Sequence, residues 1–258
     1  KGVILNPLLV CSKSTRKFLP EYDRVRIVTS APTKDILDEV GIEEDVVAIG
    51  GGAVIDTAKI LSKNPIKCYP TTAAGSSSTS WSVYWDGTKK CSLKRMLPDD
   101  VILNESFIEE LPEEIIVSTT YDVVSHCLDS MFSKKATDES INYCEEALNI
   151  LRMEITNLEL INAGHIAGKA IEITGTNLLH SLSYPVTGHY GISHGIALGY
   201  FLPKVSKFIG YDVSDIIGHK EIDLDIDIDF VVKEAFEYEK INEIDISLDN
   251  KTLMEILK

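Results

Sequence analysis

The sequence predicts an α/β N-terminal domain in residues 1–106 and an all-α C-terminal domain in residues 107–258. In the first hundred residues, short apolar runs alternate with segments of helical spacing, which is the pattern of a parallel sheet covered by helices. After about residue 105, apolar residues recur with helical spacing over long amphipathic stretches instead. Because clefts between domains are favoured ligand sites, residues that carry chemistry are expected at this junction.

The individual elements follow from these patterns in chain order. Apolar runs predict strands at residues 8–11, 25–28, 46–49 and 101–103. A helix is predicted over residues 33–40, where Gly41 supplies a natural C-cap. Further helices are expected at residues 113–132, 139–152, 164–183, 195–208 and 230–240.

Residues 222–229 alternate isoleucine or leucine with aspartate. This period of two predicts a strand with one charged face, and a solvated connector before the next helix fits the same pattern. A calcium loop is disfavoured, because the glycine that such loops need is missing.

Composition excludes several classes of function. The 258 residues are 44% hydrophobic and 25% charged, which is typical of a soluble globular protein. A formal net charge of −15 opposes binding to nucleic acid, and the short basic stretch at residues 89–95 is interpreted as a solvated loop or edge. No apolar run approaches the roughly 20 residues that span a bilayer, and no signal peptide is recognisable, so a cytoplasmic protein is expected. The five cysteines are widely spaced without a CxxC, which disfavours a disulfide framework.

Three consecutive glycines, Gly50, Gly51 and Gly52, lie between the strand at 46–49 and a following helix. They permit a tight turn and a close approach of a ligand, and the N-terminus of the helix suits a pyrophosphate. The spacing is not the common GxGxxG fingerprint, so phosphate binding and a simple tight turn both stay open at this point. The polar loop at residues 70–78 either lines the same ligand or is a flexible loop.

Asp122 and His126 are four residues apart on a helical stretch, which places them on one face, although such a pair is also common on surfaces. Three of the six histidines, His180, His189 and His194, fall within fifteen residues. We expect His180 to end one helix, a loop to follow from Pro185, and His194 to begin the next helix. Two imidazoles that meet the Asp122–His126 pair make a site of one carboxylate and three histidines with an open position for substrate.

In combination these segments resemble the iron-containing (group III) alcohol dehydrogenase family. Residues 50–59, GGGAVIDTAK, are similar to its GGGSxxDxAK signature, and residues 70–73, PTTA, to the start of its PTTxGTGSE loop. Residues 98–112 resemble its PxxxIxDP…LP segment. The pairs Asp122 with His126 and His180 with His194 stand where the family has its metal ligands. The resemblance runs in order from about residue 8 to residue 203.

The resemblance implies a dinucleotide-binding α/β domain and an all-α metal-binding domain, the fold that this family shares with dehydroquinate synthase. It implies a metal-dependent, NAD(P)-linked alcohol dehydrogenase that reduces aldehydes. The expected partners are small-molecule substrates and a second copy in a homodimer, with no nucleic acid and no membrane. The metal, Fe(II) or Zn(II), would be held by Asp122, His126, His180 and His194. The residues implied to contact the nicotinamide cofactor are Gly50, Gly51, Gly52, Asp56, Lys59, Thr71 and Thr72. His189 is a candidate proton relay, with a packed or solvent-facing histidine as the alternative.

The sequence also departs from the family pattern. The chain is shorter than the usual member, mainly in the helical half, which predicts a more open substrate pocket or one that a partner subunit completes. Serines at 76–78 replace the GSE end of the PTTxGTGSE loop, and Tyr184 stands where many members have a second histidine. The family's NAD-preferring aspartate is replaced near Ser12, with Lys13 and Arg16 nearby, so NADPH is expected to be accepted.

Other functions remain open. Residues 85–93 resemble a branch that reduces phosphonoacetaldehyde to hydroxyethylphosphonate. Glycerol-1-phosphate dehydrogenase and a dehydroquinate synthase-like enzyme are the enzyme alternatives, although the latter has a glutamate where Asp122 stands. A non-catalytic homologue that binds nucleotide or metal structurally is favoured by the short length and the altered serine loop, and disfavoured by the intact set of four ligands.

Overall fold

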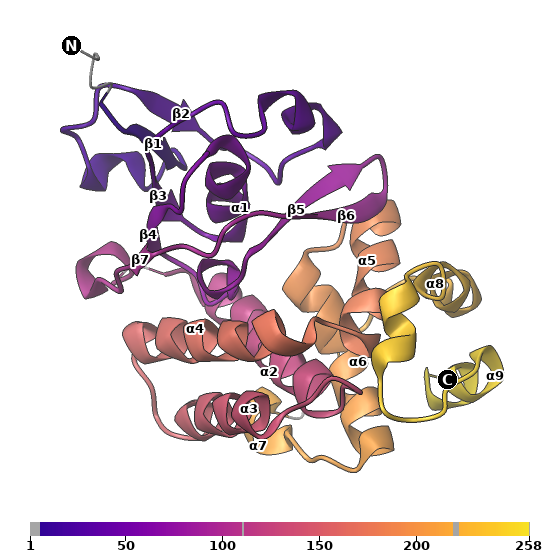
Figure 1. Cartoon of the computed structure of the whole chain (residues 1–258). Helices are drawn as coiled ribbons and strands as arrows, with labels where there is room; N and C mark the ends of the chain where they lie inside the picture. Colours follow the sequence, from indigo (N-terminus) through magenta and orange to yellow (C-terminus); the bar gives the residue numbers. More distant parts are fainter. Residues whose placement is uncertain (1–5, 110, 219–221, 258) are drawn as a thin grey trace.

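The computed structural model describes residues 6–109, 111–218 and 222–257. Its first half contains a parallel five-stranded sheet of order β2-β1-β3-β4-β7. The strands are β1 (Leu8–Cys11), β2 (Val25–Ile27), β3 (Val46–Gly50), β4 (Lys67–Pro70) and β7 (Asp100–Val101). Helix α1 (Gly52–Leu61) follows β3 almost directly and packs on one face of the sheet (Figure 1).

The central strands β1 and β3 are buried along their whole length, because both of their faces are covered. Val10 and Ala48 pack toward α1, whereas Leu9 and Ile49 belong to a second cluster on the opposite face. This packing fixes the carboxyl end of β3, and with it the glycine turn, at the edge of the sheet where parallel α/β folds bind ligands.

A separate antiparallel hairpin, β5 (Trp81–Asp86) and β6 (Lys89–Lys94), reaches from the sheet toward the helices. In Figure 1 it lies beside α1 on one side and α5 on the other. A Cβ atom on Gly188 of α5 would lie 2.1 Å from the carbonyl oxygen of Thr88, so the helix passes in direct contact with the hairpin turn.

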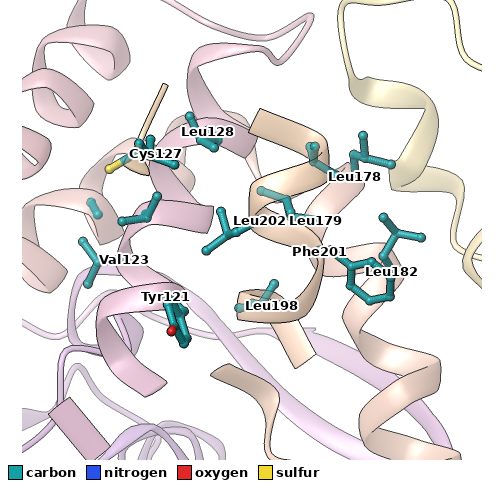
Figure 2. Packing of buried hydrophobic residues seen from close by; sticks show 14 of the residues in the cluster. Tyr121, Val123, Cys127, Leu128, Leu178, Leu179, Leu182, Leu198, Phe201 and Leu202 are labelled. Atoms are coloured by element: carbon teal, nitrogen blue, oxygen red, sulfur yellow. The ribbon is translucent and has the colours of Figure 1, made fainter. Parts of the chain in front are cut away.

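The second half is helical. Its helices are α2 (Glu113–Met131), α3 (Asp138–Leu151), α4 (Asn157–Thr174), α5 (Leu178–Tyr190), α6 (His194–Ile209), α7 (Ser214–Ile217), α8 (Ile228–Ala235) and α9 (Asn250–Leu257). Short 3₁₀ helices are η1 (Arg16–Phe18), η2 (Lys34–Glu39), η3 (Ser76–Ser78), η4 (Glu105–Phe107) and η5 (Glu239–Glu243). Figure 2 shows side chains such as Val123, Leu182 and Phe201 packed into one apolar cluster, which fixes the helices that carry the site.

The predicted fold is confirmed: a parallel α/β half precedes a helical half, and the four predicted strands are all present. The boundary between residues 106 and 107 stays a prediction, although it lies just before α2. Residues 222–227 form a connector without a partner strand, and Ile222, Leu224 and Ile226 pack against the helical core while the aspartates face solvent.

Three predicted helices differ from the structure. Residues 34–39 form only a 3₁₀ helix. The segment 164–183 is two helices, because Gly175 has a φ of +72° and Asn177 caps the start of α5. The helix expected over 230–240 is α8 followed by η5. Within the described ranges, no helix combines the length and apolar character that a bilayer crossing requires.

Candidate metal centre and adjoining cavity

A cavity of about 640 Å³ lies between the two halves of the chain. The start of α1, the loop at residues 74–79 and the hairpin line it from the sheet side, and α2, α5 and the start of α6 line it from the helical side. The lining residues include the four candidate metal ligands as well as residues of α1, the hairpin, α5 and η5. Among them are Gly52, Asp56, Trp85, Lys90, Asp122, His126, His180, Tyr184, His194 and Lys240. The cavity therefore connects the glycine turn with the histidines.

One carboxylate oxygen, Oδ1 of Asp122, lies at the centre of the histidine cluster. The Nε2 atoms of His126 and His180 are each 3.4 Å from it, and that of His194 is 3.9 Å from it. Ligand atoms of Asp122, His180 and His194 all lie within 4.8 Å of one another. The ring of His126 stacks on that of His180 with centroids 4.7 Å apart. The structure thus places three of the four predicted ligands, Asp122, His180 and His194, within reach of one ion. The fourth, His126, lies beside Asp122 and His180.

The donor set fits a divalent metal ion. Oδ1 of Asp122 and Nε2 of His180 are buried, and neither has a hydrogen-bond partner in the described part of the chain. Buried polar atoms in folded proteins are nearly always paired, so two unpartnered ligand atoms that face each other indicate a site suited to a cation. Imidazole nitrogens with one carboxylate suit Fe(II) or Zn(II).

Burial and mutual charge determine the protonation of this cluster. Burial alone would raise the pKa of Asp122, but the surrounding His126, His180 and His194 hold it below its ordinary value. Burial lowers the pKa of His126 to about 4. The pKa of His194 is also far below its ordinary value, first because of burial and then because of the charge on Lys90. At neutral pH the cluster therefore contains a carboxylate with neutral imidazoles at His126 and His194, which is the state that binds metal.

Asp129, one helical turn beyond His126 on α2, supports the cluster from behind. Its Oδ2 is 2.8 Å from Nδ1 of His180, and its carboxylate also accepts hydrogen bonds from the backbone N–H groups of Asn177 and Leu179. Sequence reasoning missed this residue. Its spacing of seven from Asp122 and three from His126 places it on the same helical face, and that signal was available.

The same carboxylate explains why one local prediction was wrong. His180 lies in the first turn of α5, not at the end of a helix, because Asp129 and the side chain of Asn177 satisfy the N–H groups that begin the helix there. The expected loop from Pro185 is instead helical up to Tyr190, with Pro185 inside α5. His194 begins α6, as predicted.

The three glycines form the turn between β3 and α1. A Cβ on Gly51 would lie 2.9 Å from Oγ1 of Thr72, and one on Gly52 would lie 3.2 Å from Oγ of Ser76. The polar loop at residues 70–78, called the second polar loop below, therefore packs directly on the turn. No side chain caps α1 and no acid lies in its first turn, so the N-terminus of α1 is available to an anion. Only Gly52 of the three glycines lines the cavity.

Lys59 and Asp56 form a buried pair on α1, with 3.4 Å between Nζ and Oδ1. Nζ of Lys59 also donates to the carbonyl oxygens of Ser76, Thr79 and Trp81. Lys59 is 2% exposed and does not line the cavity, so its contacts hold the second loop against α1 rather than face a ligand. Asp56 does line the cavity. Burial raises the pKa of Asp56 and lowers that of Lys59, and each residue opposes the shift of the other.

Several other predicted residues lie further from the cavity. Thr71 extends the β3–β4 pairing through a hydrogen bond from its N–H to the carbonyl of Gly50. His189 is exposed at the end of α5, where its Nε2 lies 3.8 Å from Glu234, and it is not a lining residue. The guanidinium of Arg16 donates to the carbonyl oxygens of Leu19 and Tyr22.

The interpretation of the basic stretch as solvated was wrong for two of its members. Lys90 lines the cavity. Arg95 donates to the carbonyl oxygens of Lys59 and Ser62, and thereby ties β6 to the end of α1. Alternation along the hairpin, which sends Lys90 and Ser92 to the face that lines the cavity, is the signal that distinguishes Lys90 from the exposed Lys89.

Comparison with known proteins finds similar dehydrogenases and reductases. Residues 116–221 match the model of the Fe-containing alcohol dehydrogenase family, C-terminal. The chain is 28% identical to the 4-hydroxybutyrate dehydrogenase of Clostridium kluyveri, over 67% of this chain and 57% of the relative. It is 27% identical to the 1-propanol dehydrogenase PduQ of Salmonella typhimurium, over 79% and 63%. With the phosphonoacetaldehyde reductase of Streptomyces viridochromogenes it shares 26% identity over 65% and 54%. The chain thus spans a little over half the length of these relatives.

Solved structures show the same fold. An iron-containing alcohol dehydrogenase from Thermotoga maritima superposes with a TM-score of 0.80 at 22% identity, over 98% of this chain and 91% of that one. The sulfoacetaldehyde reductase of Bifidobacterium kashiwanohense, solved with NAD+, gives a TM-score of 0.77 at 20% identity, over 98% and 90%. At these identities the likeness establishes the architecture.

Proposed function

We propose that this chain, whose residues 116–221 match the model of the Fe-containing alcohol dehydrogenase family and whose fold is like that of solved iron-containing alcohol dehydrogenases, is a metal-dependent, NAD(P)-linked aldehyde reductase. The observation that carries the proposal is the position of Asp122 Oδ1 among three imidazole Nε2 atoms, in a cavity that begins at the glycine turn.

Asp122, His126, His180 and His194 would hold Fe(II) or Zn(II). When bound, the metal supplies a Lewis acid that polarises the carbonyl, and the nicotinamide supplies the hydride. Asp129 orients the ring of His180 so that Nε2 faces Asp122. The burial that keeps His126 and His194 neutral leaves their nitrogen lone pairs available at neutral pH.

The sheet half supplies the position of the cofactor. The uncapped N-terminus of α1 would receive the pyrophosphate, and the contact of Gly51 and Gly52 with the second loop keeps that turn compact. Lys59 acts on this region indirectly, because its ammonium group fixes the carbonyl oxygens of the loop that forms the cavity wall. The hydroxyl-rich region around Ser12, which offers no carboxylate in residues 11–16, supports acceptance of NADPH as well as NADH.

Phosphonoacetaldehyde is one candidate substrate, supported by the resemblance of residues 85–93 and by a relative of that name. The test is turnover after anaerobic loading with Fe(II) or Zn(II). NADPH or NADH oxidation would be followed with short aliphatic aldehydes, succinic semialdehyde, phosphonoacetaldehyde and dihydroxyacetone phosphate. We expect turnover that requires metal and is lost in His180→Ala. If stoichiometrically loaded protein oxidised neither cofactor with any carbonyl, the reductase proposal would be wrong.

A further inference from the structure

Two lysine ammonium groups flank the ring of Tyr184 inside the cavity. Nζ of Lys90, on β6, lies 4.5 Å from the centroid of that ring, and Nζ of Lys240, in η5, lies 4.2 Å from it. The same ring stacks beside His194, with centroids 5.9 Å apart, and lies 6.2 Å from the ring centroid of His180. Both positive charges are therefore only one aromatic ring away from the candidate metal ligands.

Both lysines are held in place. The backbone N–H of Lys90 donates to the hydroxyl of Tyr238, 3.2 Å away, which ties the hairpin to the segment that carries Lys240. Nζ of Lys240 donates to Oγ1 of Thr176 at 2.9 Å and to the hydroxyl of Tyr184. Since an ammonium group has three N–H donors, Lys240 has one left to offer a ligand.

Neither ammonium group forms an ion pair with a carboxylate among the described residues; Asp129 acts on Lys240, and Asp56 interacts with Lys90, only through longer-range electrostatics. The other charges that line the cavity are matched: Asp56 pairs with Lys59, and Glu243 pairs with Lys135. Asp122 faces the histidines, and Asp129, which is not a lining residue, faces His180. A divalent cation on Asp122 would offset these last two carboxylates and leave Lys90 and Lys240 as unmatched positive charges. Partly buried charges without partners are costly, which indicates that an anion completes this site.

We propose that Lys90 and Lys240 bind the negatively charged group of a short aldehyde whose carbonyl lies at the Asp122–histidine cluster. The shared chemistry is an oxyanion, carboxylate, sulfonate or phosphonate, at the far end of a chain of a few carbons. This inference rests on the proposed function, because it places the reacting carbonyl at the metal site. On this proposal the two lysines determine which aldehyde is preferred, a role that neither the first turn of α1 nor the metal ligands perform.

The burial of Lys240 lowers its pKa to about 8, so its charge is present at neutral pH and is lost in mildly alkaline solution. Tyr184, Thr176, Tyr238 and Asp129 are the polar and titratable groups near it, and Lys90 is the neighbouring cation across the tyrosine ring. Recognition of an anion through Lys240 is therefore expected to weaken above that pH.

The experiment compares matched substrates in the metal-loaded enzyme. Succinic semialdehyde is paired with butanal, and sulfoacetaldehyde and phosphonoacetaldehyde are paired with propanal, in wild type, Lys90→Met and Lys240→Met. Lys89→Met is the control, because Lys89 neighbours Lys90 on the hairpin but is exposed and outside the cavity lining. We expect the ratio of kcat/KM for the charged over the uncharged aldehyde to fall about 10- to 100-fold in each cavity variant, the range for loss of one charged hydrogen bond. The control should keep the ratio, and the three anions will show which oxyanion is preferred.

Two binding measurements separate the possible failures. The Kd of NADH should stay the same in both cavity variants, whereas lysines that bound a cofactor phosphate would raise it. Calorimetric titration with butyrate, ethanesulfonate and ethylphosphonate measures anion binding without turnover. If the protein bound anions through the lysines but reduced no aldehyde, the proposed function would be wrong and the lysine site would still be supported. Turnover with an unchanged substrate ratio, or no lysine-dependent anion binding, would overturn the inference.

Discussion

Oδ2 of Asp129 lies 2.8 Å from Nδ1 of His180, and both side chains are almost completely buried. Burial alone would raise the pKa of Asp129, but the hydrogen bond from His180 and those from the backbone of α5 keep it below its ordinary value. The carboxylate therefore holds the proton on Nδ1 and leaves Nε2 free to face Asp122. One residue of α2 thus determines both the start of α5 and the orientation of His180, a candidate metal ligand on that helix.

Asp129→Asn should weaken metal binding about 10- to 100-fold, the usual effect of removing a carboxylate that orients a ligating histidine. The affinity is measured for Zn(II) by competition with a chromophoric chelator. Asp99→Asn, at an exposed position of the sheet half, is the control and should bind as wild type does. A folded Asp129→Asn protein with wild-type affinity would show that the second carboxylate does not support the ligand.

Lys59→Met should lower the free energy of unfolding by about 3–5 kcal/mol, because it leaves the buried Asp56 carboxylate without its cation. Urea unfolding of the metal-free protein measures this loss. Lys63→Met removes an exposed ion pair with Glu44 and should cost at most about 1 kcal/mol. If the two variants lost similar stability, the buried pair would not have the structural role assigned to it.

Gly164→Ala should destabilise the protein by about 1–3 kcal/mol through overpacking. A Cβ at this position of α4 would lie 2.4 Å from the carbonyl oxygen of Ala73, in the second polar loop. The loop must move away, so the Kd of NADH should rise as well. Lys169→Ala, at an exposed position of the same helix, should leave both quantities near wild type. Wild-type stability in Gly164→Ala would mean that the loop does not rest on α4.

His165 gives a prediction for pH. Burial, and then the charge of Lys169, lowers its pKa from 6.5 to about 4. Between pH 6.5 and pH 4 His165 is protonated in the unfolded chain but neutral in the folded chain. The free energy of unfolding therefore decreases as pH falls from about 6.5 toward 4. His165→Gln lacks this contribution and should lose less stability between pH 7 and pH 5 in urea unfolding of the metal-free protein. Equal losses in variant and wild type would contradict the buried, neutral state of His165.

Local sequence patterns predicted much of the fold. The apolar runs of β1 and β3 and the glycine turn after β3 identified the parallel sheet, because strands buried on both faces read as continuous apolar runs. The spacing of Asp122 and His126 placed both on one face of α2, as the structure has them. His194 was correctly expected to begin a helix.

The remaining features depend on contacts between distant segments. The start of α5 is set by Asp129, which is about fifty residues earlier in the chain, and no local pattern around Pro185 encodes that contact. Lys59 resembles a cofactor ligand in the motif, yet its ammonium group is taken by carbonyl oxygens of the second loop. Lys90 and Lys240 meet only because the hairpin folds across α5, so their pairing over Tyr184 was invisible in the sequence.

Hydride transfer in the cavity at the Asp122–histidine cluster can be followed by isotope transfer from the cofactor to the product. Metal-loaded enzyme would be mixed with NADPH or NADH deuterated at C4, on either face, and with a charged aldehyde such as succinic semialdehyde. Mass spectrometry would then locate the label in the alcohol. We expect deuterium from one face on the carbinol carbon, only with metal and not in His180→Ala. An alcohol product without deuterium from either face, or equal labelling without metal, would contradict the proposed hydride transfer.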